Sequence, residues 1–449
     1  MCDDLLDRRR AGVLLHPTSL PGPLLHGDLG EHAHHFLDFL VDSGMSVWQM
    51  LPVGPTGQGG SPYQCLSAHA GNPHLIDLQW LVAREWLTRD EFEELIGVGD
   101  DVGRRRCLRQ AGDRFFRAGG EARRSFDAFV AAHADWLEDY ALFVALKDHY
   151  DGLPWFEWPA PERLRDARAL QAARQRLATP IGQVCFEQYV FDCQWQALRD
   201  GAHERGIRLF GDLPIFVSRD SAEVWSEPGY FKLDAEGQCE VVAGVPPDYF
   251  SETGQRWGNP VYCWSAIEKD GFRWWIRRMA TELARFDLVR IDHFRGLESY
   301  WEIPAADEDA RGGQWVKAPG RALLETLGSA FDCLPLVAED LGVITPEVEA
   351  LRDDFDLPGM RILQFAFDSD AANPYLPHNH EANAVVYTGT HDNDTSRSWF
   401  DRLEGEQARR VHEYLGHPGE VMPWPLIRSA IASVGRLAMV PMQDVLMLG

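Results

Sequence analysis

Charged side chains end several apolar runs of this sequence, and their positions suggest a catalytic cleft. Arg290, Asp292 and His293 end one run, and Glu339 and Asp340 end another. Carboxyl groups that converge in one cleft raise each other's pKa values, whereas a nearby arginine keeps one of them ionised. Such a site can hold a nucleophile and a general acid together, as glycosyl transfer requires. The other members of this set are Asp212, His391, Asp392, Asp394 and Asp444.

Each member also has a structural interpretation. Asp292 follows Arg290 by two residues and could form a structural ion pair with it, and Glu339 could belong to the N-cap region of a following helix. The triplet from Asp392 to Asp394 could bind a divalent cation, although two nearby oxygens without further ligand spacing are a weak signal. Acids that end three different apolar runs, such as Asp292, Glu339 and Asp392, favour catalysis if these runs are strands of one barrel.

Aromatic side chains near these acids indicate a sugar ligand. A sugar ring stacks its CH faces on aromatic rings, and its hydroxyl groups need polar partners. Both kinds of residue occur in the segments that follow the second and third apolar runs: Tyr63, Asp248, Tyr249, Phe250, Gln255, Trp257 and Asn259.

Residue types that bind metals or form disulfides show no recognisable spacing. The histidines at 26, 32, 34 and 35 have no cysteine or carboxylate partner at the intervals of a zinc site, so a surface role is favoured. The 8 cysteines include no CxxC pair, which fits reduced, mostly buried thiols better than a disulfide framework. We therefore expect no cofactor and no metal in the chemistry.

Eight short apolar runs, bounded by Gly, Pro or Asp, read as strands that are buried on both faces. Helical periodicity separates most of them, as at 31–43 and 346–354. Alternating strands and helices predict an α/β fold, a (β/α)8 TIM barrel with its polar strand ends on one face. The predicted strands are 12–19, 46–53, 207–217, 286–294, 334–342, 359–367, 384–393 and 437–446.

Two intervals are too long for a simple crossover helix, so we expect one catalytic domain over 1–449 that carries two insertions. Residues 55–205, after the second strand, read as a mainly helical insertion, with a solvated helix over 163–178. Residues 218–285, after the third strand, read as a substrate loop followed by a helix from 272 to 286.

Composition narrows the classes of partner. The 449 residues are 45% hydrophobic and carry a formal net charge of −26, which suits a neutral substrate and argues against nucleic acid. The N-terminal segment lacks a signal-peptide core and no run of 18 apolar residues occurs, so we expect a cytoplasmic protein without a membrane partner. Nothing in the sequence indicates the oligomeric state.

The sequence resembles the amylomaltases, the 4-alpha-glucanotransferases of glycoside hydrolase family 77. The motifs that carry the resemblance include MLPVGPTGQGGSPYQ, GVPPDYFSETGQRWGNPVY, VRIDHFRGLESYWEIP, LVAEDLG and YTGTHDNDT. The resemblance implies transfer of α-1,4-glucan segments from maltodextrins, starch or glycogen fragments by a retaining mechanism. It implies Asp292 as nucleophile, Glu339 as general acid/base and Asp392 as a stabilising carboxylate. The implied sugar-binding residues are Tyr63, Asp212, Asp248, Gln255, Trp257, Arg290 and His391.

The chain departs from the family pattern at its end and after SPYQ, where Cys65 and His69 stand. Family members continue with a loop and a closing helix, so we expect the last barrel helix to be missing and apolar surface to be exposed beside the first and eighth strands. Two alternatives remain: a retaining α-glucan hydrolase, or a non-catalytic glycan-binding protein. We also expect Arg290 to contact Asp292 and lower its pKa, and Glu339 to favour its protonated form.

Overall fold

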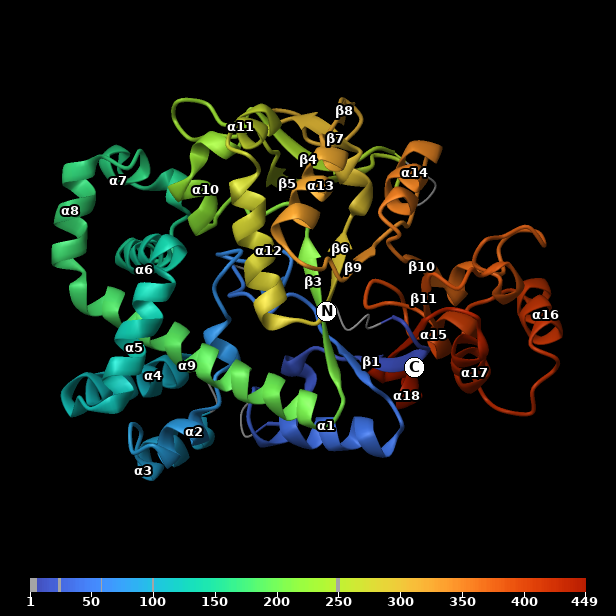
Figure 1. The fold of residues 1–449 in the computed structure, drawn as a ribbon, viewed down its shortest axis with the longest axis horizontal. Helices are drawn as coiled ribbons and strands as arrows, with labels where there is room; N and C mark the ends of the chain where they lie inside the picture. Colours follow the sequence, from blue (N-terminus) through green and yellow to red (C-terminus); the bar gives the residue numbers. More distant parts are fainter. Residues whose placement is uncertain (1–5, 23–25, 58, 99–100, 248–250) are drawn as a thin grey trace.

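Eight parallel strands form a nearly closed barrel at the centre of the molecule (Figure 1). The structure, a computed structural model, describes residues 6–22, 26–57, 59–98, 101–247 and 251–449. In the barrel the strand order is β10-β11-β12-β1-β2-β3-β6-β9. The strands are β1 (Arg10–Leu14), β2 (Val47–Gln49), β3 (Arg208–Pro214), β6 (Leu288–Asp292), β9 (Leu336–Ala338), β10 (Gly359–Ile362), β11 (Ala384–Tyr387) and β12 (Leu437–Pro441).

All eight predicted strands are therefore confirmed, and each is shorter than its apolar run. The run predicted over 384–393, for example, is a strand only to Tyr387, because the polar residues that follow form a loop. Between β9 and β10 the barrel is joined by the backbone N–H of Ala338, which donates to the carbonyl of Pro358 at 2.9 Å. The fold class is thus the expected TIM-like (β/α)8 fold.

The barrel interior changes from apolar to polar along the strands. Val47, Phe210 and Leu288 are buried in an interior cluster. Because side chains alternate along a strand, the residues two positions later point to the same side. These are Gln49, Asp212 and Arg290, all of them buried and polar. The polar layer lies at the C-terminal ends of the strands, where active sites of this fold occur.

Helices cover the outside of the barrel. Phe36, Leu37 and Leu40 make the buried stripe of α1 (Glu31–Asp42), which lies where helical periodicity predicts it. The predicted helices at 346–354 and 272–286 are α14 (Pro346–Asp354) and α12 (Arg273–Arg285). The remaining helices of the second half are α13 (Gly320–Ala330), α15 (Ser396–Asp401), α16 (Gly405–Tyr414), α17 (Trp424–Ala432) and α18 (Met442–Val445).

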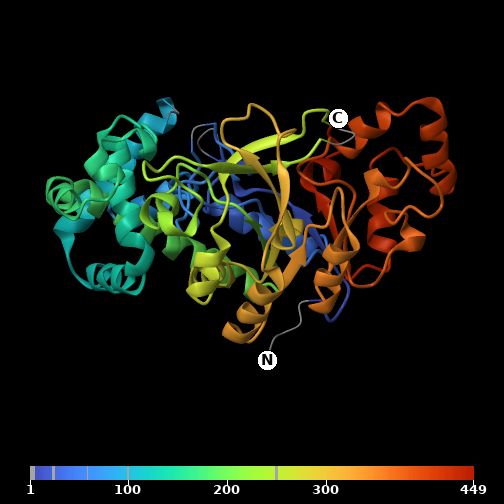
Figure 2. The ribbon, with the colours of Figure 1, turned by 90° about the horizontal axis from the view of Figure 1, so that it is seen from above.

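The insertion predicted over 55–205 is helical and lies to one side of the barrel (Figures 1 and 2). The predicted single helix over 163–178 is wrong. Asp166 interrupts it, because its side chain accepts the backbone N–H groups of Arg168 and Ala169 and starts a new helix. The helices are α2 (Leu78–Ala83), α3 (Arg89–Val98), α4 (Asp101–Ala118), α5 (Glu121–Ala132), α6 (Ala134–His149), α7 (Ala160–Arg163), α8 (Ala167–Arg176) and α9 (Ala178–Glu204).

The sequence did not predict a second sheet, of which β4 and β5 lie in the region read as a substrate loop and β7 and β8 follow the fourth barrel strand. It is antiparallel with the order β5-β4-β7-β8. Its strands are β4 (Val241–Val245), β5 (Gln255–Pro260), β7 (Ser299–Pro304) and β8 (Gln314–Lys317), and the flanking helices are α10 (Ala222–Ser226) and α11 (Trp264–Lys269). Short 3-10 helices are η1 (Pro17–Ser19), η2 (Pro73–Leu75), η3 (Trp155–Glu157), η4 (Pro228–Tyr230), η5 (Phe294–Leu297), η6 (Leu363–Phe365) and η7 (Pro377–Asn379).

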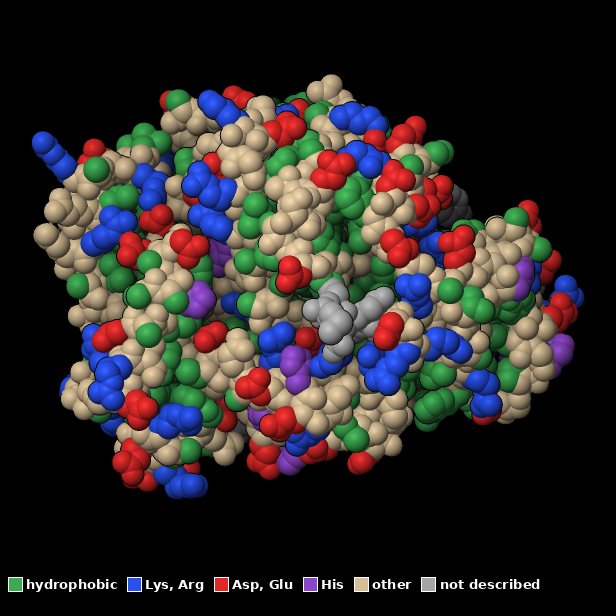
Figure 3. Space-filling model, viewed as in Figure 1, with side chains coloured by type: hydrophobic (Ala, Val, Ile, Leu, Met, Phe, Trp, Pro, Cys, Tyr) green, Lys and Arg blue, Asp and Glu red, His purple; other side chains and the backbone are tan. Residues whose placement is uncertain are grey.

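Acidic and basic side chains are interspersed over the face seen in Figure 3. Exposed apolar side chains follow the eighth barrel strand at Leu446, Met447 and Leu448, and others lie at Ile431 and Val434 near the end of α17. Within the described residues, no helix is long and apolar enough to cross a membrane.

Among the described residues six cysteines are free, at 65, 107, 185, 193, 239 and 263; three of them are buried and three are partly buried. Cys333 differs from the expectation, because it is disulfide-bonded.

Candidate active site

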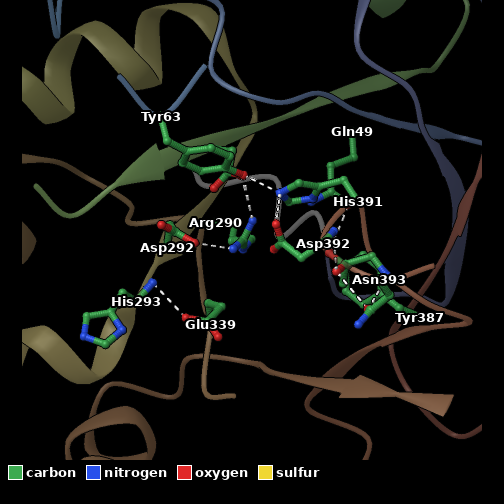
Figure 4. A network of polar contacts seen from close by, with 12 residues as sticks. Gln49, Tyr63, Arg290, Asp292, His293, Glu339, Tyr387, His391, Asp392 and Asn393 are labelled. Atoms are coloured by element: carbon green, nitrogen blue, oxygen red, sulfur yellow. Dashed lines mark hydrogen bonds and ion pairs between the residues drawn. The ribbon is translucent and has the colours of Figure 1, made fainter. Parts of the chain in front are cut away.

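The centre of the polar layer is an arginine shared by two carboxylates. Arg290 and Asp212 are paired across β6 and β3 in the strand register, and Arg290 Nη1 donates to Asp212 Oδ2 at 2.7 Å. Arg290 Nη2 donates to Asp292, two residues further along the same face of β6. The side chain of Asp212 is 1% exposed and that of Asp292 is 28% exposed. The strand period and register thus direct one buried cation toward both acids, and Figure 4 shows its contact with Asp292.

Arg290 contacts Asp292 and lowers its pKa as expected, but the net pKa shift of Asp292 is upward. Burial raises the pKa of Asp292 above its usual range, and the charge of Asp392 raises it further. Arg290 lowers this pKa, but less than burial raises it. Burial raises the pKa of Asp212 as well. The carboxylates therefore compete for one arginine in a poorly solvated site.

Glu339 follows β9 and approaches the same site from the neighbouring strand. Its Oε2 accepts the backbone N–H of His293 at 2.8 Å, and its Oε1 accepts that of Leu341 at 3.2 Å. His293 has a φ of 54°, and in this left-handed turn its N–H faces Glu339. Burial and then the charge of Asp292 raise the pKa of Glu339, so its protonated form is favoured as expected. The next helix, α14, begins only at Pro346, so Glu339 does not cap it.

Tyr63 and His391 close the other side of the arginine network (Figure 4). Tyr63 Oη donates to Asp212 Oδ2 at 2.6 Å and lies 2.5 Å from His391 Nε2, and the two rings are nearly parallel at 5.7 Å. Asp392 Oδ1 is 3.3 Å from the same imidazole nitrogen, and its side chain is 67% exposed. Asp392 therefore stands at the rim of the site, whereas Asp292 stands deeper.

The antiparallel sheet adds aromatic surface beside the acids. Trp257, on β5, meets the ring of His293 edge-on at 4.9 Å, and its Nε1 donates to Gln255 Oε1 at 3.1 Å. Trp257 therefore lies near the backbone turn that holds Glu339. Asp248, Tyr249 and Phe250 were predicted for this loop, and they lie outside the described residues.

Sequence reasoning missed two members of the polar layer. Tyr387 Oη donates to Gln49 Oε1 at 3.0 Å in the barrel interior. Gln49 is the last residue of β2, and the same rule of polar residues at strand ends could have found it.

Three acids of the original set serve the fold instead of the cleft. Asp340 accepts the N–H of Met360 at 2.7 Å and pairs with Arg352 and Arg361. Asp394 pairs with Arg402, the residue that follows the end of α15. Asp444 accepts from the side chains of Thr388 and Ser396, each at 2.6 Å, and from the Ser396 N–H at 2.8 Å.

Asn393 also has a structural contact. Its Oδ1 accepts the backbone N–H of Thr390 at 2.9 Å, which gives the triplet from Asp392 to Asp394 the geometry of a turn.

Comparison with known proteins identifies the family. The model of glycoside hydrolase family 77, described as 4-alpha-glucanotransferase, matches residues 15–449. The chain is 52% identical to the 4-alpha-glucanotransferase of Thermus thermophilus, over 98% of this chain and 91% of that protein. It is 44% identical to the chloroplastic/amyloplastic 4-alpha-glucanotransferase of Solanum tuberosum, over 99% of this chain and 79% of that protein.

A solved structure shows the same fold. The amylomaltase from Streptococcus agalactiae in complex with acarbose superimposes with a TM-score of 0.95 at 38% sequence identity, covering 98% of this chain and 91% of that one. This likeness, the family match and the carboxylates at the barrel's strand ends agree with one another. The chain belongs to glycoside hydrolase family 77, the amylomaltases, and is a 4-alpha-glucanotransferase.

Proposed function

We propose that the enzyme transfers α-1,4-glucan segments to glucose or maltodextrin acceptors by a retaining double displacement, with Asp292 as nucleophile, Glu339 as general acid/base and Asp392 as a stabilising carboxylate. The observation that carries this proposal is the pair formed by Asp292 and Glu339. Asp292 receives a hydrogen bond from Arg290, while Glu339 has a raised pKa. One group is thus ready to attack and the other ready to donate a proton.

In the first step an oxygen of Asp292 attacks the anomeric carbon as Glu339 gives its proton to the departing glycosidic oxygen. The bond to the leaving sugar breaks, and a covalent β-glycosyl ester forms. Arg290 orients Asp292, and the backbone N–H groups of His293 and Leu341 orient Glu339. In a retaining enzyme the two carboxyl groups stand about 5–5.5 Å apart.

In the second step Glu339, now ionised, accepts the proton of the acceptor's 4-hydroxyl group, and this oxygen displaces Asp292. The exposed carboxylate of Asp392 would face the positive charge that develops on the sugar ring in both steps. No cofactor or metal enters either step.

The proposed sugar contacts divide by exposure. Trp257 supplies an aromatic face and Gln255 is exposed beside it, both on β5. The resemblance adds Asp248, which lies outside the described residues. Tyr63 and His391 border the nucleophile. We assign Asp212 to positioning, because its buried carboxylate bonds Tyr63 and Arg290. The neighbour from Streptococcus agalactiae, named as a complex with acarbose, supports a glucan-like ligand.

The decisive experiment is incubation with maltotriose and analysis of all products. A transferase releases glucose and forms maltodextrins longer than the substrate, whereas a hydrolase gives only shorter ones. A glycan-binding protein leaves maltotriose unchanged and forms no trapped covalent adduct. Products no longer than maltotriose, at any acceptor concentration, would overturn the transferase proposal.

We place this reaction in the cytoplasm, with no nucleic-acid or membrane partner. The net charge of −26 argues against a nucleic-acid partner. The six free cysteines among the described residues favour the cytoplasm, whereas the disulfide of Cys333 counts against it. Cell fractionation that recovers the activity from a membrane or secreted fraction would contradict it.

A further inference from the structure

Outside the active site, two imidazoles and a carboxylate from separate segments meet at one point. His26, His74 and Asp101 each offer a ligand atom, and these atoms all lie within 4.8 Å of one another. His74 Nδ1 is 3.6 Å from Asp101 Oδ1. A tetrahedral zinc ion, with bonds of about 2.0–2.1 Å, holds its ligand atoms roughly 3.3 Å apart. The three side chains are therefore already close to a coordinating arrangement.

Contacts around the two histidines position the ring of His26 and the backbone of His74. His26 Nδ1 lies 3.2 Å from the carbonyl oxygen of Gly27, and donation there leaves Nε2 to bind an ion. The ring centroids of His26 and His74 are 5.6 Å apart at an angle of 52°. Asn72 accepts the backbone N–H of His74 at 3.0 Å, which holds η2 in place. An outer hydrogen bond to a ligating histidine is a regular feature of metal sites.

A third contact joins η2 to the helix that carries Asp101. Arg104, on the first turns of α4, is buried and donates to the carbonyl oxygens of Pro73 and Ile76. Its positive charge opposes cation binding, and the carboxylate of Asp101 offsets it. The position of Asp101 relative to His74 therefore depends on a packed contact and not on a free loop.

The ligand types select the class of ion. Two nitrogens and one carboxylate oxygen suit zinc and related transition-metal ions, whereas magnesium and calcium prefer oxygen ligands throughout. We propose that His26, His74 and Asp101 form a zinc site that ties the segment before α1 and the 3-10 helix η2 to the first turn of α4. The site would fasten the helical insertion to the barrel and take no part in glycosyl transfer.

Sequence analysis placed His26 with three other histidines and favoured a surface role for all four. The structure separates them, because His32 and His35 lie on the exposed side of α1, with ring centroids 6.1 Å apart. The partners of His26, His74 and Asp101, lie 48 and 75 residues further along the chain. No local spacing could have revealed them.

Metal titration of the full chain tests the proposal. After removal of bound metal with a chelator, calorimetry should show one zinc ion per chain, and cobalt(II) should give the visible bands of tetrahedral coordination. His74→Gln and Asp101→Asn should each weaken zinc binding by more than about tenfold, the loss that removal of even an outer partner can cause. Zinc should raise the Tm of the wild type and not that of either variant.

The double variant His32→Gln/His35→Gln is the matched control and should bind zinc as the wild type does. Absence of stoichiometric binding, unchanged binding in His74→Gln and Asp101→Asn, or loss of binding in the control would each overturn the proposal. Zinc held by cysteine thiols would persist in both test variants and so count against it. Asp101→Asn changes only an exposed side chain, which keeps the test valid if His74→Gln fails to fold.

Discussion

Two sets of carboxylates at the same edge of the barrel differ in how their oxygens are used. Asp340 joins β9 to β10 through Met360, Arg352 and Arg361, and both of its oxygens are hydrogen-bonded. Asp444 holds the loop after β11 in the same way. Asp292 contrasts with both, because among the described residues its hydrogen-bond donor is Arg290, which also serves Asp212.

This contrast separates acids that build the site from acids that react in it. A buried carboxylate with several donors is a stable anchor, and loss of its charge would leave those donors unsatisfied. In the cleft, the raised pKa of Glu339 suits a general acid, whereas the hydrogen bond from Arg290 favours the ionised form of Asp292 that a nucleophile needs. The same residue type near the ends of barrel strands thus has two different functions.

Replacing the nucleophile should have the largest effect on catalysis. Asp292→Asn keeps the shape of the side chain but cannot attack the anomeric carbon, so transfer should fall by at least three orders of magnitude, more than about 4 kcal/mol. Maltodextrin binding, measured by calorimetry, should be largely retained. Asp444→Asn is the control and should lower the Tm while kcat stays within a few-fold of the wild type. Near wild-type turnover of Asp292→Asn would refute the mechanism.

Removing the general acid should produce a smaller loss that depends on the leaving group. Glu339→Gln should lower kcat on maltotriose by about 10²–10⁴-fold. Formation of the covalent intermediate should survive with a glycosyl fluoride donor, whose leaving group needs no proton. Equal losses on both donors, measured in single-turnover experiments, would contradict the acid role.

Removing an anchor acid should affect stability. Asp340→Ala removes the buried carboxylate that Arg352 and Arg361 share. Among the described residues it leaves Arg352 only the exposed Asp353 as an acidic partner, so we expect the free energy of unfolding to fall by about 3–5 kcal/mol. The exposed pair of Asp394 and Arg402 is the control, and Arg402→Ala should change stability by at most about 1 kcal/mol. Urea unfolding measures both. Similar losses of stability in the two variants would show that a buried carboxylate with several donors contributes no more than an exposed ion pair.

The pH dependence of stability should show the smallest effect. Burial raises the pKa of Glu282 from 4.5 to about 7, so the native state binds a proton more tightly than the unfolded state. Its contribution to stability is therefore complete below about pH 4.5 and is lost as the pH rises toward 7, at about 1.4 kcal/mol per pKa unit.

As the pH rises from 4.5 to 7, the Tm of the wild type should therefore fall relative to that of Glu282→Gln, whose amide does not titrate. The variant comparison also cancels the opposite trend from buried His69 and His293, whose pKa values burial lowers to about 3 and about 4. A difference that stays constant from pH 4.5 to 7 would show that Glu282 does not titrate with folding.

Local patterns predicted the barrel well and the second sheet not at all. Each barrel strand is a run of apolar residues, because strands buried on both faces need such a run. Strand β8 is largely exposed, and β5 begins with the exposed polar residues Gln255 and Arg256, so neither has the apolar run of a barrel strand. The sequence there resembles a loop, and only the register with β4 and β7 makes it a sheet.

The same distinction applies to the site. The family motifs and the polar strand ends are enough to indicate Asp292, Glu339 and Arg290, because the strand period brings residues two apart to one face. Burial and shared partners are properties of the packed molecule, so only the tertiary structure showed that Asp340 and Asp444 are anchors, that Asp212 is buried, and that burial outweighs Arg290 at Asp292. A carboxylate's chemistry depends on the solvent and donors around it, and these come from segments that the chain brings together only when it folds.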